Sequence, residues 1–198
     1  MDGIYFYSFF WMVWVIATFF MKKTVWRTMV AAVALITIIL SSVSLNIGGF
    51  QITLSFLFLF FLSCYYAAKQ SRRKLVYMAI AVLTVAFAYT SFQLLVFFDP
   101  VWIWMDHRWM LAILLVILCF LFYENIQSRL LCLVIGSCQG EMLYSIISQK
   151  VSFSYIIGSY SFLDTVSLSA CCTFIWALVD YIPVYIDGKK PIRGTRQP

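Results

Sequence analysis

A group of polar residues interrupts a long apolar stretch in the last third of the chain. Residues 136–145 read GSCQGEMLYS, and the residues on either side of them are mostly apolar. If this stretch and the residues that follow it form a helix, successive residues turn by about 100°, which places five polar side chains on one face. The five are Ser137, Glu141, Tyr144, Ser145 and Ser148. The sequence therefore predicts a polar stripe with a carboxylate at its centre.

Glu141 would lie near the middle of a membrane-spanning helix, where a carboxylate is costly. Such a group is either protonated, hydrogen-bonded, or exposed to a water-filled cavity that admits a cation. Serine and tyrosine hydroxyls, Gln93 and Gln139 are possible hydrogen-bond partners. Two interpretations stay open: a neutral contact between helices, or an intramembrane site for an ion, a proton or a small solute.

Two glycines lie beside this polar stripe, and they form a G-x-x-x-G pattern. Gly136 and Gly140 are four residues apart, so they share one side of a helix. Small residues at this spacing let a second helix approach closely, and van der Waals contact then favours association. We expect these glycines to serve packing rather than bending, and we expect this helix to be interior.

A second concentration of chemistry is the segment FFDPVWIWMDHRW, between two apolar stretches. Aspartate before proline favours a turn, and tryptophan prefers the membrane–water boundary. An interfacial turn and a lid over an outward-facing cavity both fit this composition. Its candidate functional residues are Trp102, Trp104, Asp106, His107 and Arg108. In the last apolar stretch, Asp164 near the outer boundary and Asp180 nearer the inner one are further candidates for binding a ligand or ion.

Known catalytic and metal-binding patterns do not match this sequence. GSCQG is not the G-x-S-x-G of a nucleophile elbow, and the chain has no H-E-x-x-H, Walker loop or C-x-x-C. The six cysteines lie in apolar stretches, where cysteine usually acts as a small apolar residue. We therefore expect a protein that is not an enzyme and holds no metal or cofactor. An intramembrane enzyme would need reactive groups that converge near the membrane boundary, for example His107 with Asp164.

Composition identifies the elements that must position these residues. Of the 198 residues, 64% are hydrophobic and 11% are charged, and the mean hydropathy is +0.94. Soluble domains are about 45–50% apolar and about 25% charged. The apolar stretches are long enough to cross a hydrocarbon core of ~30 Å as helices. The sequence therefore predicts an all-α, polytopic membrane helix bundle.

The apolar stretches predict seven membrane-spanning helices. They lie at about residues 4–21, 28–45, 52–68, 75–97, 109–123, 130–148 and 163–185. The connection over residues 149–165 could be an external loop, a short surface helix or a re-entrant segment. Residues 1–186 would form a single transmembrane domain, and residues 187–198 a short, basic cytoplasmic tail that is disordered.

Lysine and arginine predict the orientation, because they are enriched in cytoplasmic loops. Seven spans with the N-terminus outside leave only Arg108 and Lys150 of the 14 basic residues on the outer side. The net charge of +6 then reflects orientation and contact with lipid, and a nucleic-acid partner is not expected. The prediction is an N-out, C-in protein.

The opening IYFYSFFWMVWVIATFFMKK, the basic connector AKQSRRK and the overall size resemble the YphA family, small multi-pass membrane proteins of Bacillus and its relatives. This resemblance implies a bacterial plasma membrane and an uncharacterised role. It assigns no site residue.

Two functions follow from the residues themselves. The first is a non-enzymatic membrane protein that associates with other membrane proteins or with itself, as the glycine pattern and the missing catalytic motifs suggest. The alternative is a carrier or substrate-binding subunit for an ion or small solute, with an intramembrane carboxylate site at Glu141.

Overall fold

The computed structural model describes residues 2–47, 50–99, 101, 104–150 and 156–186. Seven helices lie in this part of the chain. They are α1 (Ile4–Val15), which continues as the π-helical turn η1 (Ile16–Phe20), α2 (Val25–Leu40), α3 (Leu54–Ala68), α4 (Arg72–Phe98), α5 (His107–Phe122), α6 (Ile126–Lys150) and α7 (Tyr160–Ile186). All seven predicted helices are therefore present, with shifted boundaries. The predicted tail, 187–198, lies outside the described residues.

The helices differ in length. Among the described residues, α4 with 27 residues and α6 with 25 are long and apolar enough to cross a membrane. At ~1.5 Å per residue, both exceed the ~30 Å of a hydrocarbon core. The apolar helices α2, α3 and α5 have 16, 15 and 16 residues.

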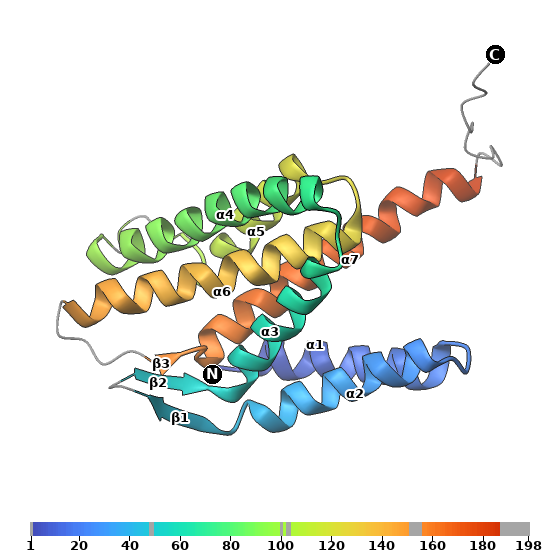
Figure 1. Cartoon of the computed structure of the whole chain (residues 1–198), viewed down its shortest axis with the longest axis horizontal. Helices are drawn as coiled ribbons and strands as arrows, with labels where there is room; N and C mark the ends of the chain where they lie inside the picture. Colours follow the sequence, from blue (N-terminus) through green and yellow to red (C-terminus); the bar gives the residue numbers. More distant parts are fainter. Residues whose placement is uncertain (1, 48–49, 100, 102–103, 151–155, 187–198) are drawn as a thin grey trace, which may run out of the picture.

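The helices run back and forth between two ends of the molecule (Figure 1). The α1–α2, α3–α4 and α5–α6 connections lie at one end, which we call the basic end. Its basic residues in the described part are Lys22, Lys23, Arg27, Lys69, Arg72, Arg73, Lys74 and Arg129. The opposite end, which we call the sheet end, holds the N-terminus, the strands, Arg108 and Lys150. Basic residues are thus segregated as the sequence predicted.

A small sheet at the sheet end was not predicted from the sequence. Strands β1 (Ser44–Ile47) and β2 (Phe50–Thr53) pair antiparallel, and β3 (Ile156–Ile157) pairs parallel to β2. The helix predicted at 28–45 therefore ends early, at Leu40. The helix predicted at 52–68 begins late, at Leu54. Two glycines at positions 48 and 49 disfavour a helix here, and the backbone groups of both strands pair with each other instead.

The connection left open at 149–165 is now described in part. Helix α6 continues to Lys150, β3 follows at Ile156, and α7 begins at Tyr160 rather than at residue 163. Residues 151–155 lie outside the described part. The second half of the connection is therefore a strand and a turn, and it joins the sheet instead of forming an isolated surface loop.

Polar residues are buried and large apolar residues are exposed, which is the pattern of a bundle that faces lipid. Glu141 and Asp164 are fully buried. Phe19, Phe87 and Leu121 are 73%, 61% and 77% exposed. Helix α6 lies between α4 and the inclined α7 in Figure 1, as expected of an interior helix.

Candidate functional site

The glycines of α6 bring it unusually close to α4. A Cβ atom on Gly136 would lie 2.6 Å from Val85 Cγ1, and one on Gly140 would lie 2.7 Å from Tyr89 Cβ. Real Cβ atoms essentially never approach so closely, so both positions need glycine. The G-x-x-x-G side of α6 therefore packs on α4 of the same chain. This approach brings the Tyr89 side chain to Glu141.

The Glu141 carboxylate accepts hydrogen bonds from a side chain and from the backbone. Tyr89 donates its hydroxyl to Oε2 at 2.7 Å, and Gly158 donates its backbone N–H to Oε1 at 3.3 Å. Gln93 donates its amide to the Tyr89 hydroxyl oxygen at 3.2 Å. Gln93, Tyr89 and Glu141 thus form a hydrogen-bonded chain that ends in a fully buried carboxylate.

The backbone N–H of Gly158 contacts Glu141, and only glycine fits at this position. Its φ of +74° is in the left-handed region, and a Cβ there would lie 2.4 Å from Thr53 Oγ1 and 2.5 Å from Phe56 Cβ. The Thr53 hydroxyl donates to the Gly158 carbonyl at 2.8 Å. The sheet therefore holds the donor of Glu141 in place. Sequence reasoning missed both Gly158 and Tyr89, although Tyr89 lies one helical turn before Gln93.

The other polar residues of α6 are also buried. The hydroxyl oxygens of Ser137 and Ser145 are buried, and no hydrogen-bond partner for them occurs in the described part of the chain. Tyr144 is nearly buried and lines a pocket at the sheet end. The predicted polar stripe therefore exists, but its two central serines form no network with Glu141.

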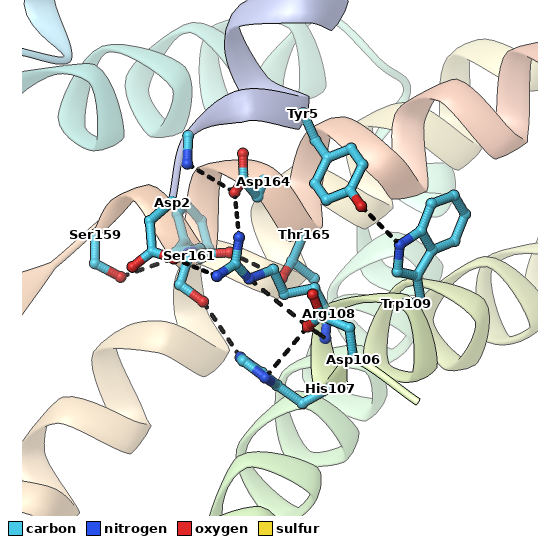
Figure 2. Close-up of polar contacts among 12 residues, drawn as sticks. Asp2, Tyr5, Asp106, His107, Arg108, Trp109, Ser159, Ser161, Asp164 and Thr165 are labelled. Carbon is cyan, nitrogen blue, oxygen red and sulfur yellow. Dashed lines mark hydrogen bonds and ion pairs between the residues drawn. The ribbon is translucent and has the colours of Figure 1, made fainter. Parts of the chain in front are cut away.

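Asp164 joins three helices, as Figure 2 shows. Its Oδ2 accepts the backbone N–H of Gly3 at 2.8 Å, and its Oδ1 accepts that of Phe6 at 2.8 Å. Arg108 Nη1 donates to Oδ2 at 2.7 Å. Helix α7 thus supplies the cap for the first turn of α1, and α5 supplies the counter-charge.

Arg108 also pairs with Asp2, which precedes α1. The hydrogen bond from Arg108, and then its positive charge, hold the pKa of Asp2 below its usual value of 3.8. The Arg108 side chain is only 11% exposed, and Asp164 is fully buried. The sequence placed Arg108 in an outer loop, whereas the structure makes it a buried partner of Asp2, Asp164 and, at 3.8 Å, Asp106.

His107 links the α4–α5 connection to α7 (Figure 2). Its Nε2 lies 3.3 Å from Ser161 Oγ, and its Nδ1 lies 3.4 Å from Asp106 Oδ1. Asp106 also begins α5, because Oδ1 accepts the Arg108 backbone N–H at 3.2 Å. Serine, imidazole and carboxylate thus follow one another in the order used for nucleophilic catalysis. Sequence reasoning paired His107 with Asp164 and missed Ser161.

Of the remaining sequence candidates, Trp104 lies apart from these contacts. Trp104 is 91% exposed, which leaves it outside the cluster around Arg108. Trp102 lies outside the described residues. Asp180 belongs to the second half of α7, far along the helix from Asp164.

A pocket of about 480 Å³ lies at the sheet end, lined by residues of α4, α5 and α6 and by residues at the start of α7. Its polar lining residues are Gln93, His107, Tyr144, Ser159 and Ser161. On one side Gln93 leads to Tyr89 and Glu141, and on the other Ser161 lies one turn before Asp164. An amide, an imidazole, a phenol and two hydroxyls offer both donors and acceptors. This lining suits a small polar solute, and the volume is within the usual range for ligand pockets.

Comparison with known proteins identifies relatives but no site. The family model described as YphA-like integral membrane protein matches residues 2–197. The chain is 31% identical, over 196 residues, to the uncharacterized protein YphA of Bacillus subtilis (strain 168), with 99% of this chain and 97% of that protein covered. No solved structure matches.

Proposed function

Because the chain belongs to the family of YphA-like integral membrane proteins of the bacterial plasma membrane, we propose that its pocket at the sheet end binds a small polar solute from outside the cell. We also propose that all seven helices span the membrane, N-out and C-in. The segregation of basic residues at the opposite end supports this orientation. The protein then acts by binding rather than by catalysis.

The observation that carries this proposal is the hydrogen-bonded chain from the pocket to Glu141. Gln93 lines the pocket and donates to Tyr89, which donates to the carboxylate. A solute that binds the Gln93 amide therefore alters the hydrogen bonding of a buried acid two residues away along this chain. The part of the lining that the structure describes contains no lysine or arginine, so we expect an uncharged or cationic solute.

Glu141 itself is not an open site in this arrangement. It is fully buried, and two donors already occupy its carboxylate. The carrier hypothesis is therefore modified: the solute contacts Gln93, and Glu141 responds through Tyr89. Association with other membrane components stays a prediction. It would use a surface other than the Gly136–Gly140 side of α6, which packs on α4.

A ligand panel tests the binding proposal. The purified full-length protein is heated in detergent with sugars, polyols, amino acids and monovalent cations, and its unfolding temperature is recorded. A binder present at about 100 times its Kd adds about 2.7 kcal/mol of stability. We expect at least one compound to stabilise the wild type but not Gln93→Leu. Ser91→Ala, on the exposed side of α4, is the control and should keep the effect. The proposal fails if no compound acts, or if Gln93→Leu responds like the wild type.

A second candidate function is acyl transfer, favoured by the Ser161–His107–Asp106 distances of 3.3 and 3.4 Å. The Ser161 hydroxyl oxygen would attack an ester carbonyl, and His107 Nε2 would take its proton and return it to the leaving alcohol. Such distances are looser than in a bound complex, as is common without substrate.

A fluorophosphonate probe, which reacts with activated serines, separates this function from binding. Catalysis predicts labelling of the wild type and none of Ser161→Ala or His107→Ala. Ser159→Ala, which changes another hydroxyl of the same pocket, is the matched control and should label normally. Absence of labelling in the wild type excludes an activated Ser161 and leaves solute binding.

A further inference from the structure

A second pocket, of about 530 Å³, lies at the basic end, away from the solute pocket. The α3–α4 connection, the start of α4, the C-terminal end of α5, the α5–α6 connection and the start of α6 surround it. Its polar lining residues are Gln70, Arg73, Lys74, Tyr77, Tyr123, Glu124, Asn125 and Ser128. None of these residues lines the solute pocket.

The pocket has an excess of positive charge. Arg73 and Lys74 are exposed, and neither forms an ion pair with any residue that the structure describes. Glu124 is the single carboxylate among the described lining residues and does not balance both cations. The pocket therefore favours an anion that brings at least one negative charge.

The start of α4 supports the same conclusion independently. Its N-cap residue, Ser71, forms no side-chain hydrogen bond with the first turn, and that turn contains no acidic residue. It carries Arg72, Arg73 and Lys74 instead. The N-terminus of a helix is its positive end, so three cations there repel both the helix dipole and one another. An anion bound beside Arg73 and Lys74 would relieve both repulsions and occupy the free N–H groups.

The other walls give the pocket the amphipathic character of a membrane boundary. The Tyr77 hydroxyl donates to the Phe122 carbonyl at 3.1 Å, which fixes α4 against the end of α5. The Tyr77 and Tyr123 rings meet edge to face, with centroids 5.4 Å apart. Aromatic rings at this level prefer the region between headgroups and acyl chains. Gln70 and Ser128 add neutral hydrogen-bond donors.

We propose that this basic pocket binds a phosphate group, either in the headgroup of an anionic phospholipid or as a soluble phosphate. Basic side chains, helix N–H groups and hydroxyls are the donors that phosphate oxygens accept from. Arg73 and Lys74 supply the charge, and Ser128 and Gln70 supply the neutral contacts. The two sources of phosphate differ in whether an acyl chain is attached.

Lipid binding to the purified full-length protein tests this site. The probes are short-chain phosphatidylglycerol, phosphatidylcholine with the same acyl chains, and inorganic phosphate, and native mass spectrometry measures retention. Phosphatidylcholine carries the same phosphate but a compensating cation. A basic residue near an anionic surface contributes ~1 kcal/mol, which is about fivefold in affinity. We expect Arg73→Gln with Lys74→Gln to weaken phosphatidylglycerol binding about 25-fold.

Two further variants serve as controls. Lys22→Gln with Lys23→Gln removes the same charge elsewhere at the basic end, and because neither residue lines the pocket, phosphatidylglycerol binding should change less than about twofold. Ser128→Asp keeps every basic residue but adds a negative charge to the pocket, so it should also abolish binding. This variant keeps the test valid if the Arg73 and Lys74 variant does not fold.

Each outcome decides the question. Preference for phosphatidylglycerol without binding of inorganic phosphate supports the site and assigns a lipid. Competition by inorganic phosphate supports the site and assigns a soluble phosphate. Equal retention of both lipids with no phosphate binding overturns the proposal, and so does an equal loss in the Lys22 and Lys23 control.

Discussion

Glu141 meets two donors of different kinds, and substitutions affect the two differently. The Tyr89 hydroxyl is a side chain that can rotate, whereas the Gly158 N–H belongs to a backbone held by Thr53. Both donors are buried with the carboxylate. Removing the acceptor therefore takes from each donor a hydrogen bond that it makes inside the bundle, and each lost hydrogen bond destabilises the fold.

Two substitutions of Glu141 should consequently differ in stability. Glu141→Gln keeps one carbonyl oxygen, so Tyr89 retains an acceptor. Glu141→Leu removes both acceptors, at about 1–3 kcal/mol for each hydrogen bond lost. We expect the wild type to have the highest unfolding temperature, Glu141→Gln a lower one and Glu141→Leu the lowest. Heating the purified proteins in detergent measures these temperatures. A Leu variant as stable as the wild type would show that neither hydrogen bond stabilises the fold.

Asp2 predicts a specific response to acid. Arg108 lowers its pKa below 3.8, so the ion pair stabilises the fold fully above that pH. The contribution is lost as the pH falls through the lowered pKa. As the pH falls below 3.8, the wild type should therefore lose stability more steeply than Asp2→Asn. Unfolding temperatures across this series measure the difference. The Arg108–Asp164 pair is present in both proteins, so any difference between them comes from Asp2. If stability falls equally steeply with pH in both, the Asp2–Arg108 pair does not stabilise the fold.

At the scale of the elements, the α4–α6 pair positions the chain of hydrogen bonds. Gly140 lies against Tyr89, and the backbone oxygen of Ala86 is 2.9 Å from the place of a Cβ. A backbone atom cannot rotate away as a side-chain end can. Any side chain at Gly140 therefore moves the helices apart, and the Tyr89 to Glu141 contact moves with them.

Gly140→Ala should thus destabilise the protein by about 1–3 kcal/mol, the range for overpacking a well-filled core. A compound that binds Gln93 should also stabilise this variant less than the wild type. The reason is that the hydrogen bond from Tyr89 to Glu141 becomes longer. Unfolding in detergent, with and without the compound, measures both effects. Ser91→Ala on the same helix pair but on the exposed side of α4 is the control. Normal stability in Gly140→Ala would refute the tight packing.

For the whole molecule, the proposed orientation can be measured directly. An odd number of spans puts the two termini on opposite sides of the membrane. A tag before Met1 should react with an antibody on intact spheroplasts, and a tag after Pro198 only after permeabilisation. A single cysteine at Ser159 should react with an impermeant maleimide from outside, whereas one at the buried Ser137 should not. Both termini on one side would overturn seven spans.

The sequence predicted what is local and missed what is distant along the chain. Helical periodicity alone indicated that Glu141 lies on a buried face, because its neighbours on that face are within a few turns. The partners of Asp164 are Gly3 and Arg108, which are 161 and 56 residues away. The parallel pairing of β2 with β3 likewise joins residues on either side of α3–α6. No local pattern predicts such contacts.

The same long separations impose an order on biosynthesis. Helix α1 leaves the ribosome first, yet the carboxylate that caps its Gly3 and Phe6 N–H groups arrives with α7, 158 residues or more later. Until translation reaches Asp164, that first turn must keep water or another acceptor. A nascent chain cut short before residue 164 therefore leaves Arg108 with its exposed partner Asp2 but without the buried one, and quality-control proteases would meet an N-terminus that is still loosely held.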